Sequence, residues 1–148
     1  MSYNTLITPF LCKLFLASCI SQTPFSAADQ SVDVLFRLRF KVHILNGFAN
    51  NTKPLIIRCH SNDDDLGQHT LWNNQEFRFK FIIDLIKITH FVCNFNWGSK
   101  SLQDITVFKN AVETQTCKKT GNCFWKASED GIYFSNKNES YEKKYAWD

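Results

Sequence analysis

The sequence predicts an all-β protein, a small antiparallel β-sandwich of seven or eight strands with two disulfides. Several stretches alternate apolar and polar residues with a period of two, as half-buried strands do. Turn signals rich in Asn, Asp and Gly separate these stretches at short intervals. No stretch shows a convincing helical period, and the 14 Phe residues favour strands. The 148 residues fit one domain.

The first predicted strand covers residues 32–44, where every even position from Val32 to Ile44 is apolar. It is one long strand or two strands broken by a bend. Asn46-Gly47 then supplies a turn. Residues 55–60 form the next strand, with their apolar residues on one face.

The segment Glu76 to Trp97 predicts an antiparallel pair of strands with one apolar face. It follows a polar turn at residues 61–67 and a second turn at Asn73-Asn74. Asp84 to Lys87 is the expected connection, either a loop or one short helical turn. The shared face carries these side chains: Phe77, Phe79, Phe81, Phe91, Cys93, Phe95 and Trp97. Aromatic residues bury large areas, so this face is predicted to be core.

The last third of the chain predicts three more short strands. Residues 102–109 alternate poorly but are rich in β-formers at their end. The turn KKTGN precedes a strand in which Cys123, Trp125 and Ala127 share a face. Asp130-Gly131 predicts a two-residue type I′ hairpin loop, with residues 132–134 as the returning strand. The strand order does not follow from these patterns.

The N-terminus predicts a signal peptide. Residues 6–20 are mostly apolar, and Pro9 and Lys13 interrupt the run, which disfavours a membrane span. The small residues Ser26-Ala27-Ala28 predict cleavage before Asp29. The expected organisation is therefore a signal peptide at 1–28, a β-sandwich domain at 29–134 and a polar C-terminal tail at 135–148. A signal anchor or a buried N-terminal segment is the alternative.

Four cysteines remain after such cleavage, and an even number in a short secreted chain predicts a disulfide framework. Three pairings are open. Cys117 and Cys123 flank the KKTGN turn, which favours a bridge between them and leaves Cys59 with Cys93.

Two triplets, Asn50-Asn51-Thr52 and Asn138-Glu139-Ser140, are acceptors for N-glycosylation in polar, turn-like surroundings. Each is a predicted glycosylation site.

The charge excludes one class of partner. The net charge is only +3, and the basic residues are scattered rather than clustered in sequence, so no nucleic-acid partner is expected. No phosphate loop, metal-ligand spacing or nucleophile motif stands out, so no cofactor, metal or catalytic residue is predicted.

Several short motifs occur together in the predicted domain, and together they resemble the plant self-incompatibility protein family, also called S-protein homologues. The resemblance covers about residues 41 to 134. It rests on Val42 to Asn46, Leu55 to Ser61, Asp64 to Gly67, Phe79 to Phe81, Thr89 to Cys93, Cys117, Cys123 to Trp125 and Asp130 to Tyr133.

The resemblance implies a small secreted β-sandwich with two disulfides, with a role in protein binding rather than catalysis. Founding members are secreted ligands that meet a plasma-membrane receptor and trigger rejection of self pollen. The sequence departs from the family at two places. Phe79 stands where the family usually has Trp, and no glycine precedes Thr89. The fold expectation is unaffected, but pollen rejection is implied less strongly.

If the function is recognition, loops on a rigid sandwich are expected to carry it. The candidate loops are Asn50 to Lys53, Ser61 to Gly67, Ile83 to Lys87, Asn96 to Ser101 and Lys118 to Asn122. The residues selected within them are Ser61, Asn62, Asp63, Asp64, Asp65, Lys118 and Lys119. The expected partner is a plasma-membrane receptor protein, bound by a monomer.

Two other site hypotheses come from the acidic turn and the histidines. Asp63 to Asp65 has carboxylates that suit calcium, but the spacing is not that of an EF-hand, so a solvated turn is preferred. His43 and His90 would supply the acid and base of a secreted ribonuclease. Strand parity instead places His43, His60 and His90 opposite the apolar face, which predicts exposed histidines.

A third hypothesis concerns the aromatic residues. Exposed Trp and Tyr side chains are typical of a carbohydrate- or cell-wall-binding module. Tyr141, Tyr145 and Trp147 in the polar tail are the candidates for exposed aromatics.

Overall fold

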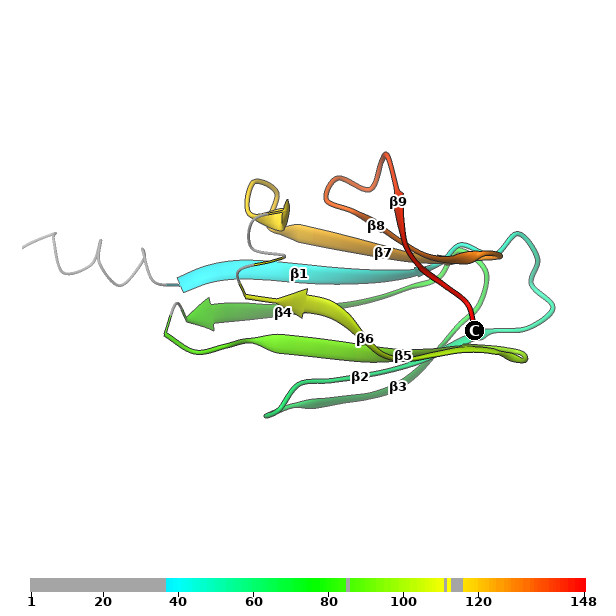
Figure 1. Ribbon diagram of the computed structural model, residues 1–148, viewed down its shortest axis with the longest axis horizontal. Coiled ribbons are helices and arrows are strands. Elements are labelled where there is room, and N and C mark those ends of the chain that lie inside the picture. Colours follow the sequence, from blue (N-terminus) through cyan, green and yellow to red (C-terminus); the bar gives the residue numbers. More distant parts are fainter. Residues whose placement is uncertain (1–36, 85, 111, 113–115) are drawn as a thin grey trace, which may run out of the picture. The chain divides into compact units, whose positions relative to one another are not determined.

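The computed structural model describes residues 37–84, 86–110, 112 and 116–148 (Figure 1). The predicted signal peptide and the start of the predicted domain, residues 29–36, lie outside these residues. The described part contains nine strands: β1 (Arg37–Asn46), β2 (Leu55–His60), β3 (Asp65–Leu71), β4 (Glu76–Asp84), β5 (His90–Trp97), β6 (Lys100–Lys109), β7 (Asn122–Ser128), β8 (Gly131–Ser135) and β9 (Glu142–Ala146). No helix in this part is long and apolar enough to cross a membrane.

The strands form two sheets, which confirms the predicted all-β sandwich. One sheet has the order β4-β1-β7-β8-β9, and the other has the order β3-β2-β5-β6. The pairs are antiparallel except for β1 with β7, which run parallel. There is one strand more than expected in the described residues because the C-terminal segment supplies β9.

The prediction that Glu76 to Trp97 folds as a strand pair is wrong, although the apolar face was assigned correctly. β4 pairs with β1, and β5 lies in the other sheet between β2 and β6. The two strands face each other across the core, with the ring centroids of Phe79 and Phe91 5.0 Å apart. Alternation specifies which face of a strand is buried, but it does not specify the neighbouring strand.

The core between the sheets is aromatic and aliphatic. The largest fully buried side chains include Phe48, Phe95, Phe108, Ile44 and Leu55. Phe79 and Phe81 are partly buried and pack against this core.

The irregular spacing of β6 has a local cause. Its register against β5 shifts twice, and Asp104 has a positive φ of 55°. Each shift moves the next side chain to the other face, so Leu102, Ile105 and Val107 are all buried despite uneven spacing. The poor alternation in the sequence reflects these bulges.

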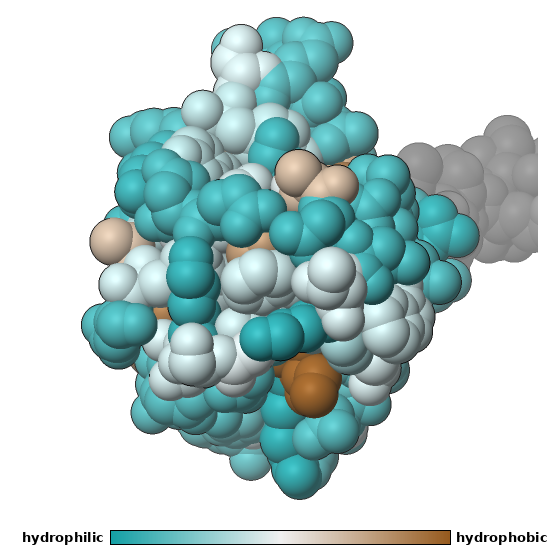
Figure 2. Space-filling view, turned by 90° about the vertical axis from the view of Figure 1, so that its right-hand side faces the viewer, coloured by the Kyte–Doolittle hydropathy of each residue, from teal (hydrophilic) through white to brown (hydrophobic). Residues whose placement is uncertain are grey.

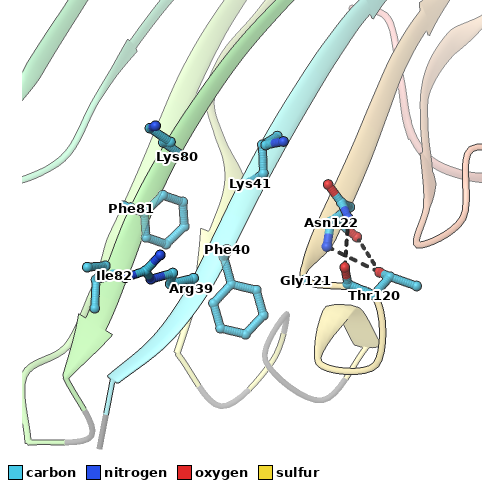
Figure 3. A pocket seen from close by; sticks show the side chains of 9 residues that line it. All are labelled: Arg39, Phe40, Lys41, Lys80, Phe81, Ile82, Thr120, Gly121 and Asn122. Atoms are coloured by element: carbon cyan, nitrogen blue, oxygen red, sulfur yellow. Dashed lines mark hydrogen bonds between the residues drawn. The ribbon is translucent and has the colours of Figure 1, made fainter. Parts of the chain in front are cut away.

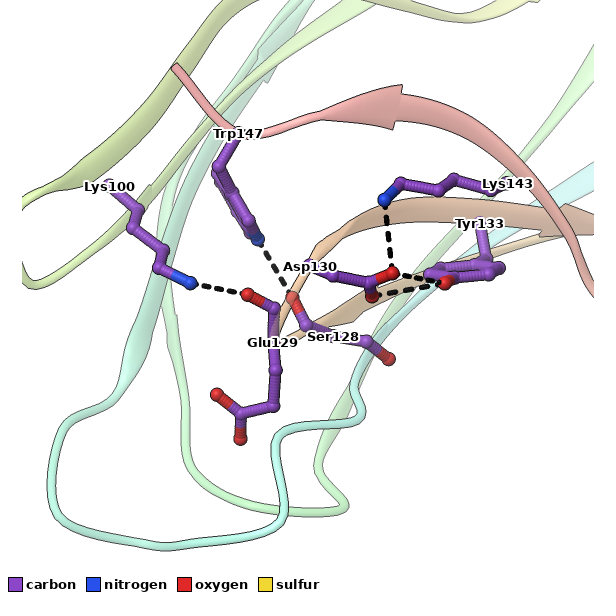
Figure 4. Close-up of polar contacts among 7 residues, drawn as sticks. All are labelled: Lys100, Ser128, Glu129, Asp130, Tyr133, Lys143 and Trp147. Atoms are coloured by element: carbon purple, nitrogen blue, oxygen red, sulfur yellow. Dashed lines mark hydrogen bonds and ion pairs between the residues drawn. The ribbon is translucent and has the colours of Figure 1, made fainter.

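The C-terminal segment is part of the sandwich, not a free polar tail. β9 pairs with β8, and Trp147 donates from Nε1 to the Ser128 carbonyl oxygen at 2.7 Å (Figure 4). Trp147 and Tyr145 are partly buried against the core, which corrects the expectation that they are exposed. Polar residues in the sequence marked this segment as a tail, but alternate side chains of an edge strand face solvent.

The hairpin between β7 and β8 differs from its prediction. Ser128 pairs with Gly131, so the loop residues are Glu129 and Asp130, not Asp130 and Gly131. Gly131 has φ +155°, and a Cβ there would meet the Tyr145 carbonyl oxygen at 2.0 Å. The glycine is needed for the close approach of β9 rather than for a type I′ turn.

Both disulfides join the pairs that the turn chemistry favoured. Cys59 and Cys93 are directly opposite on β2 and β5, and their bridge is fully buried. Cys117 and Cys123 close the turn before β7.

Candidate functional site

The candidate recognition loops are divided between the two ends of the sandwich (Figure 1). At one end lie the β2–β3 turn, the β4–β5 connection and the β6–β7 connection, and we call this the β4–β5 end. The β1–β2 loop and the β5–β6 turn lie at the opposite end, which places Asn50 to Lys53 and Asn96 to Ser101 there. Figure 2 shows this opposite end, where the surface is mostly hydrophilic.

The acidic β2–β3 turn is held by its own first residue. Ser61 Oγ accepts hydrogen bonds from the backbone N–H groups of Asp63 and Asp64, and Ser61 N donates to the Asp64 carbonyl oxygen at 2.7 Å. The Asp63 and Asp64 side chains are exposed. The turn therefore presents two carboxylates to solvent from a rigid backbone.

Asp65 has a structural role at the start of β3. Its carboxylate accepts from the Gly67 backbone N–H at 2.8 Å and pairs with Arg58 at 2.7 Å. The Gly67 hydrogen bond, and then the Arg58 guanidinium, hold the pKa of Asp65 below its usual value. Of the three acidic residues, Asp65 thus uses its carboxylate in contacts that stabilise the fold.

The β4–β5 connection exposes aliphatic side chains beside the acidic turn. Ile88 is 77% exposed and Ile86 is 88% exposed, and Ile82 at the end of β4 is 52% exposed. A pocket of about 210 Å³ is lined by Ser61 to Asp64 on one side and by residues including Ile82 and Ile88 on the other. Asn110 fixes the connection by donating to the carbonyl oxygens of Lys87 and Thr89. The tertiary fold therefore brings two of the predicted loops together.

The third predicted loop at this end is the turn closed by Cys117 and Cys123. Gly121 N donates to the Cys117 carbonyl oxygen at 2.7 Å, and Thr120 Oγ1 donates to the Asn136 carbonyl oxygen at 2.8 Å. Lys118 and Lys119 are exposed on the outside of this turn.

A basic groove on the outer face of the five-stranded sheet was not predicted. It is lined by Arg39, Phe40, Lys41, Lys80, Phe81, Ile82, Thr120, Gly121 and Asn122 and has a volume of about 690 Å³ (Figure 3). Its cations come from β1 and β4, which are more than 30 residues apart in the chain but are paired in the sheet. Strand parity placed each cation on an outer face, but only the pairing of β1 with β4 gathers them.

The histidines do not form the acid–base pair of a ribonuclease. His43 and His90 lie on the outer faces of different sheets, with the core between them. His43 is also only 7% exposed, which corrects its predicted exposure. It contacts Glu76 at 2.6 Å and Asn122 at 2.9 Å, and it stacks on Phe124 at 4.2 Å between ring centroids. Neighbouring strands thus bury this outward-facing side chain.

His90 and His69 make local contacts. His90 Nε2 is 2.9 Å from Thr106 Oγ1, and His69 Nε2 is 2.8 Å from the Leu66 carbonyl oxygen. Nowhere in the described ranges do three or more His, Cys, Asp or Glu side chains form a group that could hold a metal ion.

The two predicted glycosylation residues lie on the surface. Asn50 and Asn138 are exposed, and Asn50 Oδ1 accepts from Thr52 Oγ1 at 2.8 Å within its acceptor triplet. Asn50 is in the β1–β2 loop, at the end opposite the β4–β5 end.

Comparison with known proteins agrees with this architecture. The sequence profile described as plant self-incompatibility protein S1 matches residues 41–147. S-protein homolog 7 of Arabidopsis thaliana is 30% identical over 108 residues, which are 72% of this chain and 80% of the relative. Self-incompatibility protein S1 of Papaver rhoeas is 28% identical over 93 residues, covering 63% of this chain and 66% of the relative.

A solved self-incompatibility protein homologue has a similar fold. Its TM-score is 0.51 at 16% identity, over 74% of this chain and 94% of the solved one. The profile match extends through β9, in keeping with the place of that strand in the sheet. With the profile matching most of the described sandwich, this chain belongs to the plant self-incompatibility protein S1 family.

Proposed function

We propose that this protein acts outside the cell as a ligand, and that it binds a membrane receptor protein through the β4–β5 end of the sandwich. The relative from Papaver rhoeas is named a self-incompatibility protein. The solved relative is described as one of a widespread family of small, highly stable, secreted plant proteins. The two buried disulfides suit an oxidising compartment.

The observation that carries the proposed binding surface is the exposure of Ile82 and Ile88 beside the acidic turn, with Ile86 exposed on the same connection. Fully burying one such side chain contributes about 1.5–3 kcal/mol. Several of them exposed together, rimmed by polar residues, mark a protein interaction site. Asp63 and Asp64 supply charges at the rim, where they favour one orientation of the partner.

Loops on a β-sandwich are suited to receptor binding because the rigid sheets hold them in fixed positions. The Ser61 hydrogen bonds and the Cys117–Cys123 bridge fix two of the three loops. A pre-organised surface loses less conformational entropy on binding. A glycan on Asn50 would leave this surface clear, since Asn50 lies at the other end.

The test is binding of the labelled, secreted protein to intact cell surfaces. We expect saturable binding that protease treatment of the cells removes. Ile88→Ser is expected to weaken it about tenfold, which corresponds to about 1.4 kcal/mol of lost apolar burial. Trp72→Ser is the matched control, because Trp72 is 42% exposed and its neighbour Asn73 donates from its backbone N to Asn51 Oδ1 of the β1–β2 loop, at the opposite end.

Equal weakening by Ile88→Ser and Trp72→Ser would contradict the choice of the β4–β5 end. Binding that survives protease treatment would contradict a protein receptor altogether.

A further inference from the structure

The outer face of the five-stranded sheet carries four cations on two adjacent strands. Lys41 on β1 is directly opposite Lys80 on β4. Arg39 is two residues from Lys41 on β1, and Arg78 is two residues from Lys80 on β4, so all four share this face. None of the four forms an ion pair with another described residue.

This arrangement is unfavourable for the isolated protein. Side chains directly opposite in an antiparallel pair have Cβ atoms about 4.5–5.5 Å apart, and like charges there are destabilising. On the same face, Glu76 is two residues from Arg78 and contacts His43, but it is four residues from Lys80. The fold therefore maintains a repulsion between Lys41 and Lys80, neither of which pairs with a described carboxylate.

Protection of an exposed sheet edge explains only half of the cluster. Charged residues on an edge strand hinder pairing with other chains, and β4 is an edge strand. Arg39 and Lys41 lie on β1, however, and β1 is covered on both sides by β4 and β7. Their charges protect no edge, so they require a different explanation.

Three of the four cations, Arg39, Lys41 and Lys80, line one concave surface, the basic groove (Figure 3). Its wall is the Thr120–Asn122 segment, which Lys41 N holds by donating to the Gly121 carbonyl oxygen at 2.8 Å. Ile82, half exposed, lies opposite Arg39 and adds an apolar contact at one margin. Among the described residues that line the groove there is no Asp or Glu.

We propose that the basic groove binds an extended acidic segment of the partner protein that carries carboxylates at alternate positions. Same-face cations on one strand are about 6.8 Å apart, the spacing of alternate side chains in an extended peptide. Carboxylates at that spacing meet Arg39 and Lys41 on β1, and the carboxylate at Lys41 also meets Lys80 directly opposite, which reduces the repulsion between the two lysines. The inference rests on the proposed function in taking the partner to be a protein.

The direct test uses two short synthetic peptides of the same composition. Glu and Val alternate in one, and they form two blocks in the other. We expect the alternating peptide to bind more tightly, and to bind less as salt rises, because the contacts are exposed charge pairs. Lys41→Gln with Lys80→Gln is expected to weaken it about tenfold.

The matched control is Lys137→Gln with Lys144→Gln, which changes the net charge equally at exposed positions outside the groove. We expect it to leave peptide binding unchanged. Removing the Lys41–Lys80 repulsion should also leave the unfolding temperature unchanged or raised, which separates lost binding from lost folding.

Equal effects of the two double variants, or equal binding of the two peptides, would overturn the proposal. So would binding of polygalacturonate, an acidic polysaccharide, without binding of the alternating peptide. Cell-surface binding that depends on Ile88 but not on Lys41 and Lys80 would overturn the groove while leaving the proposed function in place. If neither the wild-type protein nor any variant binds cell surfaces, only the proposed function is overturned. The peptide measurement would still show whether the basic groove binds an acidic segment.

Discussion

At the scale of single residues, polar side chains on this sandwich are held by contacts between distant parts of the chain. Asn122 Nδ2 donates to the Thr120 carbonyl oxygen, so its Oδ1 faces His43 and accepts from Nε2. Asp130 accepts from the Tyr133 hydroxyl at 2.8 Å and pairs with Lys143 of β9 at 3.0 Å (Figure 4). These side chains tie a hairpin or a strand to its neighbours.

Asp130 is expected to make stability depend on pH. The Lys143 and Tyr133 hydrogen bonds hold the pKa of Asp130 below its usual value, about 3.9 in an unfolded chain. As pH falls, the Asp130 carboxylate is therefore protonated in the unfolded chain before it is protonated in the folded protein. The stabilisation by Asp130 is full above about pH 4, and it is lost as pH falls through the lower pKa of the folded protein. Asp130→Asn is expected to flatten the loss of unfolding free energy below about pH 4.

Urea unfolding at a series of acidic pH values measures this effect. Asp63→Asn is the control, since the Asp63 carboxylate is exposed and forms no ion pair with a described residue. Parallel pH profiles for the wild-type protein and Asp130→Asn would show that Asp130 does not contribute.

At the scale of elements, the C-terminal strand completes the five-stranded sheet. β9 pairs with β8 and brings Tyr145 within 6.3 Å of Trp125 between ring centroids. Just beyond β9, Trp147 stacks at 6.0 Å on Phe48, which itself stacks on Trp97 at 4.0 Å. This aromatic column joins the β1–β2 loop, β5 and the C-terminus.

Removal of residues 141–148 is expected to lower the free energy of unfolding by about 2–3 kcal/mol, because Tyr145 and Trp147, which pack against the core, are lost. Thermal unfolding and intrinsic tryptophan fluorescence measure the change. Trp147→Ala should give part of the effect, and Lys144→Ala, an exposed residue of β9, should give almost none. A truncated protein as stable as the full chain would show that β9 does not contribute to the free energy of unfolding.

At the scale of the whole molecule, the two disulfides act on different lengths of chain. The Cys59–Cys93 bridge spans 34 residues of sequence and the Cys117–Cys123 bridge spans 6. The entropy of closing a loop grows with its length, so the first bridge restricts the unfolded chain more. It also links β2 to β5 at the centre of the four-stranded sheet.

Replacing Cys59 and Cys93 together with Ala is expected to cost about 4 kcal/mol, and replacing Cys117 and Cys123 about 2 kcal/mol, from loop closure alone. Guanidinium unfolding of the two double variants measures the difference. If the Cys117 and Cys123 variant were the less stable of the two, native packing around the short loop would outweigh chain entropy.

The sequence alone determined properties that depend on neighbouring positions. Alternation fixes which side chains of Phe77 to Phe81 and of Phe91 to Phe95 face the core, because successive residues of a strand point to opposite faces. The close spacing of Cys117 and Cys123 around a turn favoured the observed pairing. The acidic turn at Ser61 to Asp64 was recognisable from its residues alone.

Only the tertiary structure decided which strands are neighbours. A strand forms its hydrogen bonds through the backbone, so the side chains of β4 do not show that β1, rather than β5, pairs with it. The basic groove needs that pairing, because Lys41 and Lys80 come together only across it. The burial of His43 needs it too, since strands on either side cover a side chain that parity alone places in solvent.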